Sequence, residues 1–207
     1  MAARLFSRIA RFALVAAAAT SLAGCGVNSI PTAQENAKAK WADVQSQYQR
    51  RSDLIPNLVA TVKGYATHEE DTLTKVTEAR AKATSVQVTA DDVSDPDKMA
   101  KFEKAQGELS QGLGRLLATT EAYPQLKANE SFLALQSQLE GTENRINIAR
   151  TDYNEAVRQY NVTIRTFPAV LAANVIYGSK PMVPFTATTP GAETAPAVSF
   201  DTPAAKK

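Results

Sequence analysis

Apolar side chains recur in steps of three and four residues along most of this chain. Because an α-helix turns once every 3.6 residues, such steps place the apolar side chains on one helix face. No alternating strand pattern competes with them. The sequence therefore predicts an all-α fold, an elongated antiparallel bundle of long helices. The first run of this kind is Trp41, Val44, Tyr48, Ile55, Leu58, Val62, Tyr65 and Val76.

Pro56 falls inside the first predicted helix, which spans about residues 34 to 87. A proline has no N–H, so the carbonyl of Ser52 loses its donor and the ring pushes that carbonyl aside. The apolar phase is the same before and after the proline. We therefore expect one long helix kinked at Pro56, and a true break with Ser52 or Asp53 as the new cap is the alternative.

Two further helices follow a polar connection at 88–95. Asp95-Pro96-Asp97 has the acid and proline typical of a helix start, and apolar spacing continues from it to Tyr123. The longest regular pattern predicts a helix over about 127–166. A short apolar segment at 169–177 follows Pro168. The Pro/Ala/Thr-rich composition that begins at Ser179 predicts disorder, and we place the bundle domain at 34–185 with a tail at 186–207.

The first 24 residues are typical of an export signal, with three arginines, no acid and an apolar run at 12–19. That run is short for a transmembrane helix. Leu22-Ala23-Gly24-Cys25 follows and resembles a bacterial lipobox, in which Cys25 receives a diacylglycerol. We expect a signal peptide at 1–24 and a lipidated tether at 25–33. An uncleaved anchor or an ordinary signal peptide are the alternatives.

The N-terminal segment also predicts where the protein is located in the cell. Several acyl chains anchor a protein stably, so the predicted location is the bacterial cell envelope, outside the cytoplasm. Gly26 favours the outer membrane, facing the periplasm, in a cell that has two membranes.

Cys25 is the only cysteine, which excludes an internal disulfide. Residues 25–207 carry 20 basic and 21 acidic side chains, which argues against nucleic acid as a partner.

Polar residues interrupt the apolar stripes at two places. Arg51 lies on the core phase of the first helix, two residues before Asp53, and Thr142 lies on that of the last, beside Glu143, Asn144 and Arg145. A buried charge is costly unless it is paired. We predict a polar layer of Arg51, Asp53, Glu143, Asn144 and Arg145 that fixes helix register, with partner binding or snorkelling to the surface as alternatives.

A second polar pattern consists of Asn147, Asn154 and Asn161, which recur every seven residues. These asparagines form a line beside the apolar seam of the last long helix. They are expected at a solvated boundary, or bonded to a neighbouring helix.

The sequence lacks the usual motifs of metal binding, nucleotide binding and catalysis. His68 is the only histidine and cannot complete a zinc site. The acids at 91–97 lack the spacing and glycine of a calcium loop, and they are expected to cap a helix. The glycines at 107–114 follow no strand, so they do not form a nucleotide loop. We predict no enzymatic activity and no cofactor besides the lipid.

Four blocks of the sequence resemble the LemA family. They are residues 50–83 (RRSDLIPNLVATVKGYATHEEDTLTKVTEARAKA), 121–146, 149–161 and 167–173. The resemblance implies a helical bundle on the outer side of a bacterial membrane with no established biochemical activity. Many members keep an N-terminal transmembrane helix and end the domain with an aromatic residue followed by Glu. This sequence has a lipobox, and Thr186 follows Phe185.

These features predict a membrane-tethered envelope lipoprotein that serves as a non-catalytic interaction or scaffolding module for another envelope protein. A bundle that binds a small ligand or lipid, opening around Gly107 to Gly114, is the alternative. An enzyme that uses Glu143, Arg145 and Arg51 together is a third hypothesis, and burial of these groups in a closed cluster would argue against it.

Overall fold

The computed structural model describes residues 2–66 and 68–186, with side chains from residue 27 onward. The described chain consists of helices joined by turns and one extended segment, without strands. This confirms the predicted all-α fold. The helices are α1 (Ala2–Lys63), α2 (Glu70–Ser85), the 3₁₀ turn η1 (Asp92–Ser94), α3 (Pro96–Thr120), α4 (Pro124–Lys127), α5 (Glu130–Thr163), α6 (Ala169–Ala172) and the π-helical turn η2 (Ala173–Tyr177).

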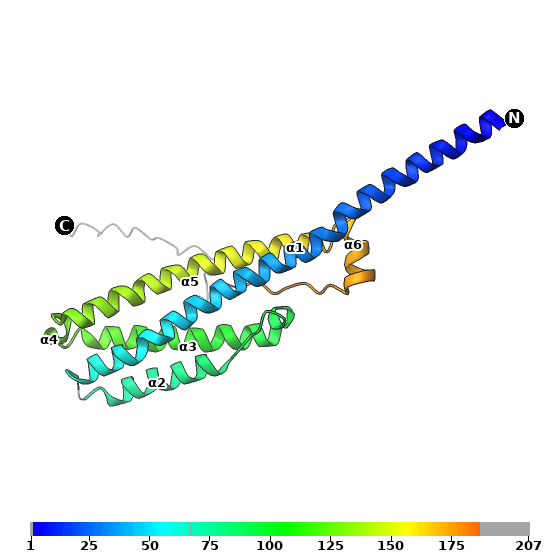
Figure 1. The fold of residues 1–207 in the computed structure, drawn as a ribbon. Coiled ribbons are helices and arrows are strands. Elements are labelled where there is room, and N and C mark those ends of the chain that lie inside the picture. Colours follow the sequence, from blue (N-terminus) through cyan, green and yellow to red (C-terminus); the bar gives the residue numbers. More distant parts are fainter. Residues whose placement is uncertain (1, 67, 187–207) are drawn as a thin grey trace, which may run out of the picture.

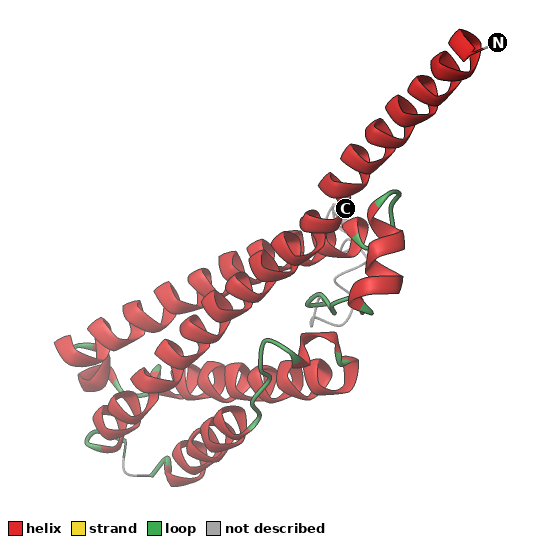
Figure 2. Cartoon of the chain, turned by 45° about the vertical axis from the view of Figure 1, so that its right-hand side comes forward, coloured by secondary structure: helices red, strands yellow, loops and turns green. Residues whose placement is uncertain are grey.

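The four long helices form an elongated antiparallel bundle (Figure 1). α1 packs along α5, and α2 packs along α3, with the chain reversing direction between successive long helices. The N-terminal part of α1 extends beyond the bundle in both views (Figures 1 and 2). The expected tether at 25–33 is part of α1, and Ile30 is fully buried in the core. Cys25 lies outside the residues whose side chains are described.

α1 runs through Pro56 without interruption. The predicted single helix over 34–87 is nevertheless wrong, because α1 ends at Lys63 and α2 begins at Glu70. Gly64 weakens the helix at its end, and two acids, Glu70 and Asp71, occupy the first turn of α2, where they favour a helix start. The buried apolar residues that flank the turn are Val62 on α1 and Leu73 on α2, eleven positions apart. Eleven residues are close to three helical turns, so the spacing hides the reversal.

The predicted start of α3 is confirmed. Asp95 is its N-cap, and the carboxylate accepts hydrogen bonds from the backbone N–H groups of Asp97 and Lys98 at 3.0 and 3.2 Å. Pro96 occupies the first turn, where its missing N–H costs nothing. The connection before α3 is fixed by Trp41, whose indole N–H donates to the Val88 carbonyl at 2.9 Å.

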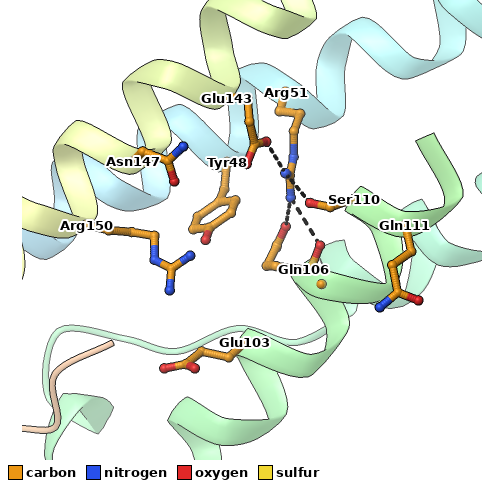
Figure 3. Close-up of a pocket in the computed structure, with 10 residues that line it drawn as sticks. Tyr48, Arg51, Glu103, Gln106, Ser110, Gln111, Glu143, Asn147 and Arg150 are labelled. Carbon is orange, nitrogen blue, oxygen red and sulfur yellow. Dashed lines mark hydrogen bonds and ion pairs between the residues drawn. The ribbon is translucent and has the colours of Figure 1, made fainter. Parts of the chain in front are cut away.

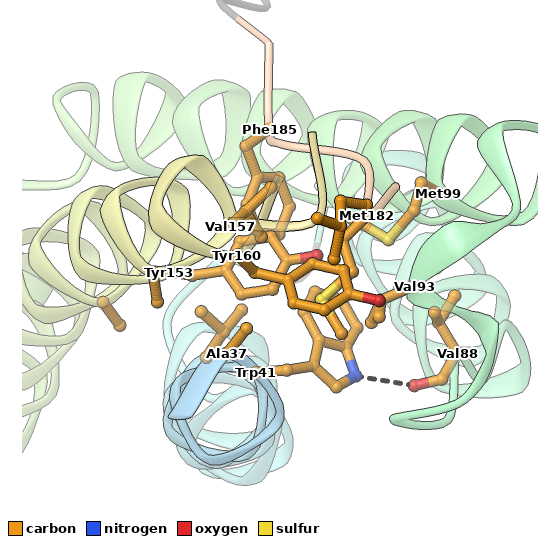
Figure 4. Close-up of a cluster of buried hydrophobic side chains, with 14 of the residues drawn as sticks. Ala37, Trp41, Val88, Val93, Met99, Tyr153, Val157, Tyr160, Met182 and Phe185 are labelled. Atoms are coloured by element: carbon orange, nitrogen blue, oxygen red, sulfur yellow. Dashed lines mark hydrogen bonds between the residues drawn. The ribbon is translucent and has the colours of Figure 1, made fainter. Parts of the chain in front are cut away.

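The extended segment 179–186 lies against the bundle. Met182 and Phe185 are buried in the core, and the Phe185 ring lies 5.7 Å from Trp41 and 5.5 Å from Tyr153, centroid to centroid (Figure 4). The disorder predicted from Ser179 onward is therefore wrong for 179–186, because two apolar side chains complete an aromatic core. The predicted tail beyond Thr186 lies outside the described residues.

Candidate functional site

A polar layer divides the core into two apolar clusters. One cluster, called the upper core here, includes the α1 residues from Ile30 to Tyr48. The other, called the lower core, begins on α1 at Ile55. Between them lie Arg51 and Ser52, which are 2% and 4% exposed. α3 contributes the buried Gln106 and α5 the buried Thr142 at the same level. The side chains that interrupt the apolar stripes thus meet at one height of the bundle.

The Arg51 guanidinium is the centre of this layer (Figure 3). Nη1 donates to Glu143 Oε2 at 2.9 Å and to Ser110 Oγ at 2.8 Å, and Nη2 donates to Gln106 Oε1 at 2.8 Å. The group also lies 5.1 Å from the centroid of the Tyr48 ring. Among the described residues, Nε has no acceptor. Three helices are therefore joined through one buried cation, with Glu143 as its counter-charge.

The other residues of the predicted layer do not join it. Asp53 is exposed and accepts a hydrogen bond from Gln49 on its own helix at 2.8 Å. Asn144 and Arg145 are exposed on α5. Helix geometry separates them, since neighbours in sequence lie about 100° apart around the axis, and only Glu143 faces α1 and α3. Arg145 consequently does not complete the Glu143–Arg51–Arg145 cluster of the enzyme hypothesis.

A second polar contact, between α1 and α2, depends on Pro56. The Ser52 carbonyl lacks its helical donor because residue 56 has no N–H. Arg80 on α2 supplies a replacement, and its Nε donates to that carbonyl at 2.9 Å. The proline therefore docks α2 onto α1 and leaves the helix intact.

A pocket of about 460 Å³ opens beside the Arg51 layer. Its lining is polar and carries both signs of charge: Tyr48, Arg51, Glu103, Gln106, Gly107, Ser110, Gln111, Glu143, Asn147 and Arg150. Burial raises the pKa of Tyr48 above its ordinary value, so its hydroxyl stays protonated. A Cβ added at Gly107 would meet no atom within 4 Å, so this glycine adds open space. A Cβ added at Gly112 would lie 3.6 Å from the Val76 side chain, an ordinary van der Waals contact, so the packing of α3 against α2 does not require glycine there.

The asparagine line explains how the extended segment is held. The Asn161 carboxamide accepts from the N–H of Met182 at 2.9 Å and donates to the carbonyl of the same residue at 2.8 Å. Asn154 does the same for Phe185, at 2.8 and 3.0 Å. The expectation of a solvated boundary or a helix contact is wrong for these two residues, because their partner is an extended backbone. The seven-residue spacing was the sequence signal for this function.

Other side chains lock the same segment. Tyr153 Oη donates to the Val183 carbonyl at 2.9 Å, and burial raises the pKa of this phenol, which keeps it a donor. The Val183 N–H donates to the Val93 carbonyl at 2.9 Å. At the end of the segment, Arg150 Nη2 donates to the Thr186 carbonyl and the Thr186 hydroxyl donates to Glu103, both at 3.0 Å. Arg150 and Glu103 also line the pocket, so the segment ends at its rim.

Neither a metal site nor a membrane span is found in the described part of the chain. No group of three or more His, Cys, Asp or Glu side chains within 27–66 and 68–186 is placed to hold a metal ion. No helix within the described residues combines the length and apolar character needed to cross a membrane.

Comparison with known proteins places the chain in a family. It matches the LemA family profile over residues 40–200. It is 27% identical over 157 residues to the magnetosome proteins MamQ 1 and MamQ 2 of Paramagnetospirillum magneticum, a match that covers 68% of this chain and 58% of each relative. It is also 27% identical over 124 residues to Protein LemA of Metamycoplasma hominis, covering 60% of this chain and 52% of that protein. The chain thus spans less than two thirds of the relatives it matches. With most of its bundle covered by the profile, this chain belongs to the LemA family.

Proposed function

We propose that this protein is a non-catalytic interaction module of the bacterial envelope, held on the membrane by a lipid on Cys25, whose polar pocket binds an extended segment of another envelope protein. The observation that carries the proposal is the asparagine line. Two of its members already bind an extended backbone, and the third, Asn147, lines the pocket (Figure 3).

The geometry of the line fits a repeated backbone contact. Seven residues of α-helix rise about 10.5 Å, and three residues of extended chain span about 10 Å. Asn161 and Asn154 are seven residues apart and hold Met182 and Phe185, which are three residues apart. Asn147 is one more repeat along α5, and its carboxamide has no hydrogen-bond partner among the described residues. It can therefore offer a third donor and acceptor pair to an extended chain.

The pocket beside Asn147 suits a polypeptide better than a lipid tail. Gln111 and Glu143 are exposed at its edge, and Arg150 and Glu103 provide opposite charges. Such a lining pairs backbone amides and polar side chains, whereas an apolar tail would leave these groups without partners. Arg51 is already bonded to three side chains. It can shape the pocket and supply charge without acting on a substrate.

Membrane attachment is supported by separate observations. The N-terminal 24 residues have the composition of an export signal and lead directly into the lipobox at Cys25. Family membership fits an envelope protein, and the names of the relatives state no enzymatic activity. In a cell with two membranes, we place the protein at the outer membrane, facing the periplasm.

Site-specific crosslinking in cells tests the interaction. A photo-crosslinking amino acid replaces Gln111 at the pocket edge, and the matched control carries it at Gln138, an exposed site on α5 outside the pocket. We expect an adduct with another envelope protein from position 111 only, and its loss when Asn147→Leu is added. The proposal is wrong if no such adduct forms, if Asn147→Leu leaves it unchanged, or if position 111 links only to residues of its own chain.

A small polar ligand is the second candidate for the same pocket. The buried Arg51 Nε lacks an acceptor among the described residues, and Gly107 leaves open volume beside it. The pocket volume falls within the range of small-molecule sites, about 300–1,000 Å³. Native mass spectrometry of gently extracted protein would reveal such a ligand as added mass. That mass should disappear in Gly107→Leu, whose side chain fills the space.

A further inference from the structure

The end of the bundle that carries α6 exposes large apolar side chains. Phe167 is 80% exposed and Val175 is 83% exposed. Leu171, Ile176 and Tyr177 are also exposed, so five large apolar residues lie within eleven positions. Single exposed apolar residues are ordinary, but a concentrated group of them marks a contact surface. We call these five residues the apolar end.

In this segment the small apolar residues are buried and the large ones are exposed, which is the reverse of the usual pattern. Ala169, Ala172 and Ala173 pack against the upper core, whereas the larger neighbours Leu171 and Val175 face outward. Burying a large apolar side chain stabilises a fold by about 1.5–3 kcal/mol. A segment selected only for stability of the bundle would place its large residues inward. The arrangement therefore fits a contact outside the bundle.

The apolar end lies where α1 leaves the bundle. Both overall views show α6 beside the point from which the N-terminal part of α1 extends (Figures 1 and 2), and α1 contacts α6. Ile30 of α1 belongs to the same core cluster as Ala169 and Ala172. Cys25 is five residues before Ile30, which corresponds to about 7.5 Å of helix. A lipid on Cys25 would hold this end of the bundle next to the membrane.

The charges around the apolar end also fit a phospholipid surface. Residues 159–186 contain Arg165 and Lys180 but no Asp or Glu, and both cations are exposed. Basic side chains pair with phosphate groups, and Tyr177 belongs to the residue type enriched at the membrane interface. An acidic side chain would be repelled there, and this segment has none.

We infer that the apolar end inserts into the outer layer of a lipid bilayer and sets the orientation of the bundle. α6 and η2 lie in the interface, as amphipathic anchors do. The bundle then projects away from the membrane, with the pocket of the Arg51 layer presented at a distance from the lipid. This inference rests on the proposed membrane tether and goes further by naming the surface that meets the lipid.

Depth-dependent fluorescence quenching tests the insertion. Full-length protein, extracted from membranes, is reconstituted into vesicles of phosphatidylethanolamine and phosphatidylglycerol that contain brominated acyl chains. Val175→Trp reports on the apolar end, and Leu133→Trp is the control because Leu133 is exposed on α5 far from α6. The native Trp41 is fully buried, and its signal is subtracted using the parent protein. We expect bromine quenching to be several-fold stronger for Val175→Trp than for Leu133→Trp, because an inserted apolar face lies about 5–10 Å into the boundary between headgroups and acyl chains.

Equal quenching of the two tryptophans would overturn the inference. A blue-shifted Val175→Trp emission without bromine quenching, in a sample that crosslinks as a dimer, would also overturn it, because a second copy would then cover the apolar end. The intact mass of the same sample reports acylation of Cys25. Acylated protein without selective quenching refutes only the insertion, whereas selective quenching of unacylated protein refutes only the lipid tether.

Discussion

The guanidinium Nε of Arg80 lies 2.9 Å from the carbonyl oxygen of Ser52, the carbonyl that Pro56 leaves without a helical donor. Ser52 is 4% exposed, so little water is available to replace this bond. A proline that would otherwise break the helix is thereby tolerated, and α2 is bonded to α1 at the same point.

Removal of Arg80 should therefore matter only while residue 56 is a proline. We expect Arg80→Met to lower the free energy of unfolding by about 1–3 kcal/mol, the cost of an unpaired buried carbonyl. In a Pro56→Ala background the alanine N–H can bond to Ser52, and the same substitution should cost clearly less. Urea denaturation of the four proteins measures both effects. Equal losses in the two backgrounds would contradict the explanation.

Glu143 should contribute more to stability than a half-exposed residue normally does. Its side chain is 50% exposed, but its partner Arg51 is 2% exposed. Glu143→Leu would leave a buried cation without a counter-charge. The loss for a fully buried pair is about 3–5 kcal/mol, and we expect about 2 kcal/mol here because water reaches one partner.

Two controls define this effect. Glu140→Leu, at an exposed position one turn earlier on α5, should change stability by less than about 0.5 kcal/mol. In an Arg51→Met background, Glu143→Leu should be nearly neutral, because no buried charge remains. Thermal unfolding of these variants measures the stability changes. A large loss of stability from Glu143→Leu in the Arg51→Met background would refute the pairing of Glu143 with Arg51.

Periodicity predicted most of the helices but could not reveal the turn at 64–69. Val62 and Leu73, on either side of this turn, are eleven residues apart, which is close to three helical turns, so the apolar phase is the same before and after it. Arg51 could be assigned to the core face from its position. Its hydrogen bonds to Gln106 and Ser110 could not be predicted, because the pairing of side chains between helices depends on the rotation and shift of α3 against α1.

The extended segment was missed for a different reason. Residues 179–186 have no periodicity, and their prolines are typical of disordered chain. They are held by groups from other elements, such as Tyr153 and Asn161 on α5. A composition argument cannot include these contacts. The asparagine spacing was visible in the sequence, but nothing in it named an extended backbone as the partner.

Acid should weaken the connection before α3 through Asp92. Its carboxylate accepts hydrogen bonds from Lys98 and from the Thr89 hydroxyl and N–H, and these bonds lower its pKa to about 2. The pKa in the unfolded chain is near the ordinary value of 3.8. Stability from this group is therefore present above about pH 4 and lost as the pH falls toward 2.

The substitution Asp92→Asn isolates this contribution. The variant should be less stable than the parent at pH 5, and the difference should shrink at pH 2.5, where the parent carboxylate is partly protonated. Urea midpoints at the two pH values give the comparison. A difference that is independent of pH would show that the ionised carboxylate is not the stabilising form.

Asn154 and Asn147 offer a test that separates folding from binding. Asn154→Leu removes two hydrogen bonds and leaves the N–H and carbonyl of Phe185 unpaired, so we expect a loss of about 2–3 kcal/mol and faster proteolysis after Lys180. Asn147→Leu should change stability by less than about 0.5 kcal/mol, because its side chain bonds to no described residue. Loss of the position-111 adduct in this stable variant would then reflect a lost backbone contact with the partner. If Asn147→Leu destabilises the bundle as much as Asn154→Leu does, Asn147 serves the fold, and its loss would say nothing about a partner.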